Sequence, residues 1–229
     1  MSATPNAARD EILARVRKAL SAEGTPHPGT DAPTGPTGDP HATRSPLTRH
    51  DVLDLLVERI EDYRATVVRC TTAELAQTVA GGLEGCESVV VPAGFDAAYL
   101  DAAHLDAATV RRVAEADVTD VHDIEGVDAV VSTAAVAIAE TGTIVLDHGP
   151  GQGRRGLTLL PDRHVCVVRA DQVVAGVPEA FAVLRPSVDA RRPLTWVSGP
   201  SATSDIELDR VEGVHGPRML HVVLVAEAT

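Results

Sequence analysis

A carboxylate and a glycine turn stand between two segments rich in β-branched residues. Glu140 is followed directly by Thr141, Gly142 and Thr143, which are candidate ligand-binding residues. Glycine suits a tight connection between strands because it adopts backbone angles that strain other residues. A carboxylate at the end of a strand can reach a cleft and serve there as a general base or a nucleophile. It can equally be a solvated side chain beside a hairpin turn, and from the residues alone both interpretations stay open.

A glycine-rich loop with two adjacent arginines follows the second of these segments. Residues 151–156, Gly-Gln-Gly-Arg-Arg-Gly, have the spacing of a dinucleotide-binding motif, but that motif needs a long helix directly after it. The residues before Pro161 are too few for such a helix, so we do not expect a nicotinamide or flavin site. The alternatives are a mobile surface loop and a loop whose Arg154 and Arg155 close over an anionic ligand.

Polar residues also gather after a predicted strand at residues 194–198. A glycine, several hydroxyl groups and the start of a short helix can form a cradle for an anion, although the same residues suffice to cap a helix. The candidate ligand-binding residues in this segment are Gly199, Ser201, Thr203 and Asp205.

Two histidines stand at the start of predicted strands. His164 begins one strand and is a candidate ligand-binding residue, whereas His215 precedes the last strand and is a candidate for proton transfer. A lone histidine more often has a structural role. The nine histidines show no metal-binding spacing, and we expect no metal site. Asp147 and His148 are adjacent, and adjacent side chains in a strand point to opposite faces.

The charged, aromatic and sulfur-containing residues exclude several classes of function. A net charge of −13 and a low aromatic content disfavour a nucleic-acid partner. Lys18 is the only lysine, so arginines or backbone N–H groups would have to bind an anion. The three cysteines lack zinc or iron–sulfur spacing, which favours small buried side chains in a reducing compartment. We therefore expect no cofactor bound by this chain.

The N-terminal region predicts a cytoplasmic protein that begins with a helix and a linker. Charged residues stand where a signal peptide would need an apolar segment, and no stretch approaches the ~18 apolar residues of a membrane span. Residues 1–20 have apolar positions at helical spacing, which predicts an amphipathic helix. Residues 21–46 hold six prolines and four glycines, which is typical of a flexible linker. The helix is either a frayed or self-docked end, or a handle for a partner.

Residues 47–229 are expected to form one α/β domain. Apolar runs such as residues 88–91 alternate with helical patterns such as residues 51–60. Nearly all-apolar strands are typical of a parallel sheet that is covered on both faces. From residue 136 onwards strands follow one another closely, which indicates an antiparallel portion. The predicted fold class is therefore three-layer α/β, with a mostly parallel sheet and an antiparallel portion.

Several of these blocks together resemble the lactate-utilisation (LUD) domain family. The matching residues are Ala139-Glu140-Thr141-Gly142-Thr143, Leu159-Leu160-Pro161 with His164, Gly199-Pro200-Ser201 with Thr203, Asp205-Ile206-Glu207, and Gly213-Val214-His215-Gly216-Pro217. The resemblance covers roughly residues 50 to 226. It implies a fold similar to the superfamily of glucosamine-phosphate isomerase, ribose-phosphate isomerase and CoA-transferases. It also implies a role in the oxidation of L-lactate to pyruvate, with two partner proteins that carry iron–sulfur clusters.

The leading hypothesis is an accessory or substrate-handling subunit of a lactate-oxidising system. Its site is expected to be a cleft at strand ends, where a loop arginine pairs with a carboxylate and Glu140 or His215 transfers a proton. The first alternative is a stand-alone isomerase or CoA-transferase type of enzyme, acting on a phosphorylated or thioester ligand with Glu140 as nucleophile. The second alternative is a non-catalytic assembly protein that docks its partners through the N-terminal helix.

Overall fold

The structure, a computed structural model of the whole chain, describes residues 5–21, 47–100, 110–203, 211–212 and 216–226. The chain divides into two units, Met1–Ser45 and Pro46–Thr229. The first unit contains helix α1 (Pro5–Ser21), on which Ile12 and Val16 are exposed. A proline suits the first position of a helix because its missing N–H would have no partner there. Apart from Ser21, the predicted linker lies outside the described residues.

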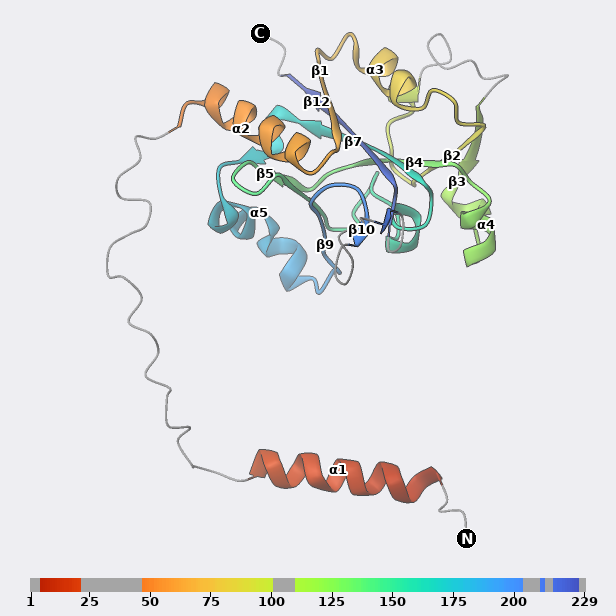
Figure 1. Cartoon of the computed structure of the whole chain (residues 1–229), viewed down its shortest axis with the longest axis vertical. Coiled ribbons are helices and arrows are strands. Elements are labelled where there is room, and N and C mark those ends of the chain that lie inside the picture. Colours follow the sequence, from red (N-terminus) through yellow and green to blue (C-terminus); the bar gives the residue numbers. More distant parts are fainter. Residues whose placement is uncertain (1–4, 22–46, 101–109, 204–210, 213–215, 227–229) are drawn as a thin grey trace. The chain divides into compact units, whose positions relative to one another are not determined.

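The second unit is built on a six-stranded parallel sheet (Figure 1). The strand order is β1-β12-β7-β4-β2-β3, and each neighbouring pair runs parallel. The strands are β1 (Thr66–Cys70), β2 (Ser88–Val91), β3 (Arg111–Ala114), β4 (Ala129–Thr133), β7 (Arg163–Arg169) and β12 (Met219–Val225). Valine is frequent in the central strands, where β-branched side chains pack well on both faces of a buried sheet.

A second sheet of four strands contains the antiparallel pairs. Its order is β8-β5-β6-β9, and β6 runs antiparallel to both β5 and β9 while β8 runs parallel to β5. The strands are β5 (Val136–Ile138), β6 (Thr143–Leu146), β8 (Val173–Val174) and β9 (Thr195–Val197), and β10 (Ala202–Thr203) pairs separately with β11 (Val211–Glu212). The predicted α/β class with a mostly parallel sheet and an antiparallel portion is confirmed. The antiparallel strands form a sheet of their own instead of extending the main one.

Helices cover the two sheets in layers (Figure 1). The helices of this unit are α2 (Arg49–Asp62), α3 (Leu75–Gly82), α4 (Val121–Glu125) and α5 (Val177–Asp189). Val79 of α3 packs on one face of the main sheet, and Leu56 of α2 packs on the other face together with the inner side of the second sheet. Leu184 of α5 covers the outer side of the second sheet. Because side chains alternate along a strand, each central strand contributes to cores on both faces.

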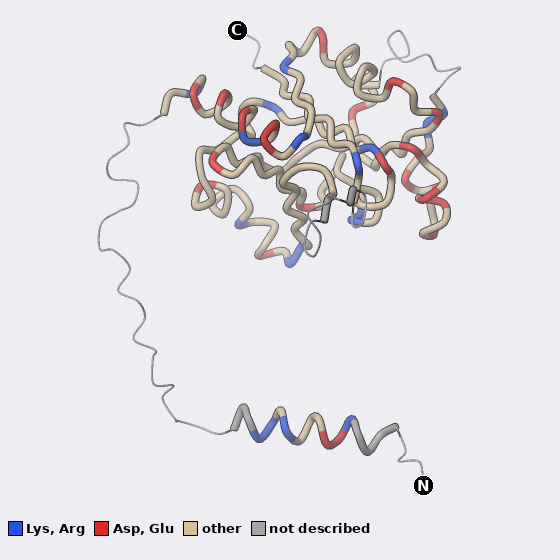
Figure 2. Tube along the Cα trace, viewed as in Figure 1, with Lys and Arg blue, Asp and Glu red and all other residues tan. Residues whose placement is uncertain are grey.

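Short helical turns complete the connections. They are η1 (Ala97–Leu100), η2 (Glu115–Asp117), η3 (Arg155–Thr158) and η4 (Ala170–Gln172). Acidic residues gather around α4, in keeping with the net charge of −13 (Figure 2). Across the described ranges, no helix combines the length and apolar character needed to span a membrane.

Candidate functional site

A cavity of about 620 Å³ opens at the edge of the main sheet where β2 and β3 end. Its lining includes Ala93 and Gly94 after β2, Glu115 after β3, and His148, Arg154 and Arg155 from the segment after β6. The carboxyl ends of parallel strands are the usual ligand-binding edge of open α/β sheets. We call this space the carboxyl-edge cavity.

The loop after β6 is bound to the end of the main sheet through its backbone. The Gly151 N–H donates to the Ala93 carbonyl at 2.8 Å, and the Thr133 N–H donates to the Gly151 carbonyl at 2.9 Å. Gly94 and Gly151 have φ angles of +82° and +79°, a region that glycine enters without strain. A Cβ at Gly94 would lie only 2.8 Å from the Cβ of Pro150. Glycine is therefore required where the two loops meet.

Glu115 joins the loops that follow β2, β3 and β6. Its Oε2 accepts a hydrogen bond from the Ala93 N–H and its Oε1 accepts one from the Arg154 N–H, both at 3.0 Å. Hydrogen bonds to an ionised carboxylate are stronger than those between neutral groups. Glu115 thus fixes one wall of the cavity with its own charge.

Asp147 braces the opposite side of the same loop. It is only 7% exposed, and it accepts hydrogen bonds from the Ser187 hydroxyl of α5 at 2.5 Å and from the Gly149 N–H at 3.1 Å. The Arg192 Nη1 lies 3.1 Å from its Oδ2. Burial acts to raise the pKa of Asp147, but the Ser187 and Gly149 hydrogen bonds and the Arg192 charge together lower it. Asp147 is therefore an ionised group whose charge is compensated.

His148 lines the cavity in a strained backbone conformation. Its φ is +54°, which is uncommon for a residue with a Cβ, and strain of this kind clusters at functional sites. The ring Nδ1 lies 2.8 Å from the Gly153 carbonyl oxygen, and Nε2 lies 2.8 Å from the Thr195 Oγ1. Because a carbonyl can only accept, Nδ1 carries a proton, and in the neutral ring Nε2 accepts from the Thr195 hydroxyl. The ring is thus oriented by both of its nitrogens.

Gln152 holds the backbone of the two preceding polar residues. Its side-chain Oε1 accepts hydrogen bonds from the Asp147 N–H at 2.7 Å and from the His148 N–H at 3.2 Å. Gln152 is itself buried. The loop is therefore closed on itself by a buried amide, which keeps the Asp147 and His148 side chains in place.

The two loop arginines have different surroundings. The Arg154 guanidinium donates to the Val118 carbonyl, so this side chain is used to hold the loop. The Arg155 side chain is exposed and lines the cavity. Within the part of the chain that the structure describes, its guanidinium has no hydrogen-bond or ion-pair partner. Arg155 is therefore the loop arginine that can bind an anion.

Glu140 lies at the other end of the β5–β6 hairpin from the arginine loop. Val136 pairs with Val145, so the arginine loop leaves the open end of the hairpin, whereas Glu140 stands in its turn. The Glu140 side chain is exposed, and its N–H donates to the Ala175 carbonyl at 3.0 Å, just before α5 begins. The structure does not bring Glu140 together with Arg154 and Arg155. A role for Glu140 in proton transfer or as a nucleophile stays a prediction.

The predicted ligand-binding threonines and glycine gather around this turn. The Thr141 hydroxyl donates to the Thr143 Oγ1 at 2.8 Å, which in turn lies 2.8 Å from the Ser198 Oγ. Gly142 has a φ of +61°, and a Cβ there would lie 2.7 Å from the backbone of Arg59 at the end of α2. The three hydroxyl groups are thus hydrogen-bonded to one another, and Gly142 allows the turn to pack closely on α2.

The second predicted polar segment is only partly described. Gly199 has a φ of +90° and packs on Tyr63, while the Ser201 N–H donates to the Pro217 carbonyl at 2.8 Å. Thr203 belongs to β10, but its side chain lies outside the described part of the structure. Asp205 and His215, with the start of the predicted short helix at residue 204, also fall outside the described residues.

His164 is buried in the main sheet instead of facing a cleft. It is 1% exposed, and its Nε2 lies 2.7 Å from the Ser132 Oγ on the neighbouring strand. Burial lowers the pKa of His164 to about 4, so the ring is neutral near pH 7. Cys166, two residues further along β7, is also buried, which raises the pKa of its thiol to about 12. These groups form a polar contact inside the core and do not reach the carboxyl-edge cavity.

Metal ligands are not grouped anywhere in the described ranges. No three His, Cys, Asp or Glu side chains among those residues are arranged to hold a metal ion. Cys70, Cys86 and Cys166 are buried free thiols on separate elements. Among the described residues, the carboxyl-edge cavity instead offers the unpaired Arg155 guanidinium, which suits the binding of an anion.

A sequence model of the LUD domain matches residues 53–225, which is most of the chain. The chain belongs to the LUD domain family. Lactate utilization protein C of Deinococcus radiodurans is 46% identical to it over 186 residues, which cover 81% of this chain and 85% of that protein. Lactate utilization protein C of Bacillus subtilis is 31% identical over 101 residues, or 42% of each chain.

A solved structure confirms the fold of this LUD domain. The crystal structure of a DUF162 family protein from Deinococcus radiodurans matches with a TM-score of 0.66 and 39% sequence identity. The match covers 79% of this chain and 99% of that one.

Two residues that line the cavity of this LUD domain, Glu115 and His148, and the neighbouring Asp147 were not predicted as site residues from the sequence. Glu115 follows a short strand in a region without a clear pattern. Asp147 and His148 were expected to point to opposite faces of a strand, but β6 ends at Leu146 and they belong to a turn. The Gly-Pro-Gly run directly after them is the sequence signal that marks the end of the strand.

Proposed function

We propose that this chain serves in lactate utilisation, as an accessory or substrate-handling subunit of a system that oxidises L-lactate to pyruvate. The likeness to Lactate utilization protein C of Deinococcus radiodurans, at 46% identity over 81% of the chain, carries this proposal. The match of the LUD domain to residues 53–225 supports it as well.

The carboxyl-edge cavity is the ligand site that we assign to this role. Arg155 supplies an unpaired guanidinium, which matches a carboxylate in both geometry and charge. His148 lines the same cavity, and its Nε2 is linked to the Thr195 hydroxyl at 2.8 Å. The protein would bind a carboxylate through Arg155, in the cavity that the oriented His148 ring helps to form.

The electrons removed from lactate would leave through partner proteins. Oxidation of L-lactate to pyruvate releases two electrons and two protons, so the reaction requires an acceptor. The cysteines of this chain lie on β1, just before β2 and on β7, which is not the arrangement of an iron–sulfur ligand set. We therefore assign the iron–sulfur clusters to two partner proteins and no redox cofactor to this chain.

Growth on L-lactate tests the proposal. Deletion of the gene should abolish growth on L-lactate and lactate-dependent dye reduction in extracts, while growth on pyruvate is retained. The tagged chain, isolated from lactate-grown cells, should carry two iron–sulfur proteins with it. Normal growth of the deletion strain on L-lactate would contradict the proposal.

Two variants at opposite edges of the main sheet sharpen this experiment. Arg155→Gln should restore less than about a tenth of the dye-reducing activity, because a lost charged hydrogen bond costs about 1.5–3 kcal/mol. Arg218→Gln removes the same charge just before β12, at the amino edge, and should restore the activity in full. If both variants restored the dye-reducing activity equally, the assignment of the cavity to this function would be wrong.

A further inference from the structure

The carboxyl-edge cavity is large for the substrate of the proposed system. At about 30 Å³ per non-hydrogen atom, the volume share of a water molecule, a space of about 620 Å³ has room for roughly 20 such atoms. Lactate has three carbons and three oxygens. This cavity is open to solvent, and ligand pockets of this volume normally hold ligands several times larger than lactate. Lactate alone would leave most of the space to water.

The charges around the cavity match a ligand with one anionic group. Arg154 is bound to the Val118 carbonyl, and Arg192 is paired with the buried Asp147 at 3.1 Å. Glu115 already accepts two backbone hydrogen bonds. Among the described residues of the lining, this leaves the Arg155 guanidinium as the cation without a partner. One phosphate or carboxylate group is enough to neutralise it.

The rest of the lining suits an uncharged portion of the ligand. Pro150 and Pro193 contribute rigid apolar surface, and Ala93 and Gly153 contribute small side chains or none. Pro193 stands before β9, whereas Arg155 begins η3 on the side of β3 and α4, so the cavity spans the ends of both sheets. A flat ring system lies favourably against apolar walls of this kind.

We infer that the carboxyl-edge cavity binds an organic anion much larger than lactate, with one phosphate or carboxylate group held by Arg155 and a ring-containing neutral part against Pro150 and Pro193. The choice of this cavity rests on the proposed function, and the larger anion, not lactate, is then the group that Arg155 holds, as an effector of the same system. A nucleoside monophosphate and an aromatic carboxylic acid are two sources of this chemistry.

Calorimetric titration of the full chain tests the ligand class. The probes are L-lactate, inorganic phosphate, adenosine 5′-monophosphate and hippurate, which pair each anionic group with and without a ring. The larger phosphate or the larger carboxylate should bind at least about 30-fold more tightly than its small counterpart, because the neutral part adds buried contact area. The preferred pair identifies the anionic group. Equal affinity within both pairs, or no binding of either large probe, would overturn the inference.

Two substitutions locate the binding. Ala93→Phe fills the cavity while leaving the backbone hydrogen bonds of residue 93 in place, and it should weaken the large anion at least about 10-fold without changing the thermal midpoint. Arg155→Gln should weaken every anion that binds, whereas Arg218→Gln should weaken none. If Ala93→Phe leaves the affinity for the large probe unchanged, the ligand lies elsewhere and the inference fails.

The outcomes separate this inference from the proposed function. If the deletion strain does not grow on L-lactate but no large anion binds, the role in lactate utilisation is supported and the inferred ligand class is wrong. If a large anion binds in the cavity but the deletion strain grows normally on L-lactate, the inferred ligand class is supported and the proposed role in lactate utilisation is wrong.

Discussion

The two edges of the main sheet use their charged side chains in different ways. At the carboxyl edge, His148 and the unpaired Arg155 face a cavity of about 620 Å³. At the amino edge there is a second pocket of about 330 Å³, which we call the amino-edge pocket. Its lining includes Cys86, Glu125, Asp128, Asp162, Arg163 and Met219. By residue type alone, this second pocket is the more promising site.

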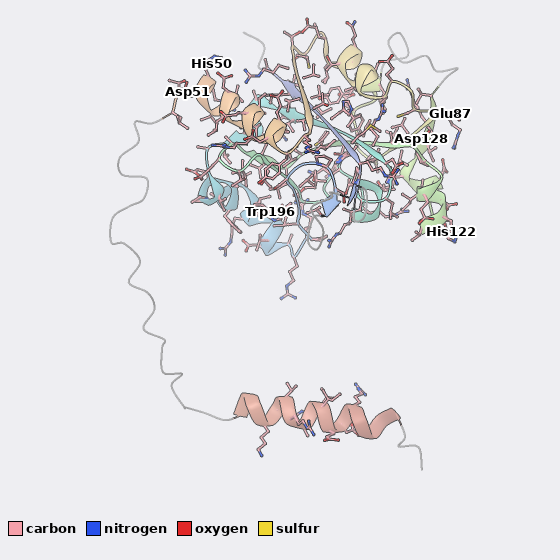
Figure 3. The ribbon with its side chains drawn as sticks, in the orientation of Figure 1. His50, Asp51, Glu87, His122, Asp128 and Trp196 are labelled. Carbon is pink, nitrogen blue, oxygen red and sulfur yellow. The ribbon has the colours of Figure 1, made fainter. Side chains whose placement is uncertain are left out.

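At the amino edge, however, the charged groups are bound by the protein itself. The Asp128 Oδ2 accepts hydrogen bonds from the N–H groups of Glu87 and Ser88 and from the Ser88 hydroxyl, each at 2.9 Å. Glu87 and Asp128 accordingly lie side by side in Figure 3. These bonds join the segment before β4 to the start of β2.

Arg163 has a similar structural use. Its Nη1 donates to the carbonyls of Gly82 at 3.2 Å and Glu84 at 2.5 Å, where α3 ends. An arginine at this position satisfies the last carbonyls of a helix and opposes its dipole. Its Nε is the buried side-chain atom that lacks a partner among those the structure describes. The comparison shows that a pocket lined by charged side chains is a candidate site only where a charged group is not already hydrogen-bonded to the protein backbone.

The largest expected effect comes from removing the carboxylate at the amino edge. Asp128→Ala should lower the free energy of unfolding by about 3 kcal/mol, because it leaves the buried Ser88 donors without an acceptor. Chemical denaturation measures this loss. Asp162→Ala is the matched control in the same pocket, since its exposed side chain makes only a 3.6 Å ion pair with Arg218. Comparable losses of unfolding free energy in the two variants would show that the hydrogen bonds of Asp128 do not stabilise the fold.

The buried His164 predicts a pH dependence of stability that is independent of any ligand. Its pKa is lowered from 6.5 to about 4 in the folded protein, so the unfolded chain binds the extra proton between these values. The contribution of His164 is therefore fully favourable above pH 6.5 and declines as the pH falls, by about 3 kcal/mol in total near pH 4.

Urea denaturation at several pH values checks this prediction. His164→Gln should show a shallower decline in stability between pH 6.5 and 4 than the parent chain. His122→Gln is the control, because that side chain is 92% exposed on α4 and should leave the decline unchanged. Parallel curves for the parent chain and His164→Gln would mean that His164 is not held neutral by burial.

Asp147, which supports the loop at the carboxyl edge, should contribute less to stability than Asp128 but more to anion binding in the cavity. Asp147→Asn keeps the shape but weakens the contacts to Ser187 and Arg192, at a cost of about 2 kcal/mol at pH 7. Since the pKa of Asp147 is lowered below 3.8, the difference from the parent chain should persist above that value and shrink as the pH falls through the folded pKa.

The same variant should also weaken anion binding by the loop. Asp189→Asn is its control, because that exposed carboxylate only pairs with Arg185 along α5. Stability measured from pH 7 to 3, together with anion titration, separates the two effects. A difference between Asp147→Asn and the parent chain that grows as the pH falls would contradict the lowered pKa of Asp147.

Much of the fold follows from local pattern, and the exceptions have local causes. The continuous valine run of β2 (Ser88–Val91) was predicted with its observed bounds, because a strand buried on both faces needs no alternation. Helix α5 was not predicted, since Pro178 and Pro186 interrupt its pattern. Pro178 nevertheless lies in the first turn, where a proline is tolerated, and it could have marked the start.

The cavity was harder to predict because its contacts are not local. Asp147 meets Ser187 and Arg192 only after α5 has packed on the second sheet, and no spacing in the sequence reveals that contact. Glu140 shows the opposite relation, because it stands near the arginines in sequence while the β5–β6 hairpin places it at the far end from them. Arg155 was included from its residue type, but only the structure separates it from the tethered Arg154.

The smallest expected effect on stability gives the sharpest test of the contrast between the edges. Arg163→Gln should cost about 1.5 kcal/mol, because it removes the charged hydrogen bonds to the Gly82 and Glu84 carbonyls, and it should leave anion binding unchanged. Arg155→Gln should change stability by less than about 0.5 kcal/mol, since its guanidinium binds no described residue, yet it should weaken anion binding at least about 10-fold. Chemical denaturation gives the stability of each variant, and titration gives its affinity for the anion. The contrast between the two edges requires the loss of stability in Arg163→Gln and the loss of anion binding in Arg155→Gln. If one arginine carries both effects, the edges do not differ in the way their contacts indicate.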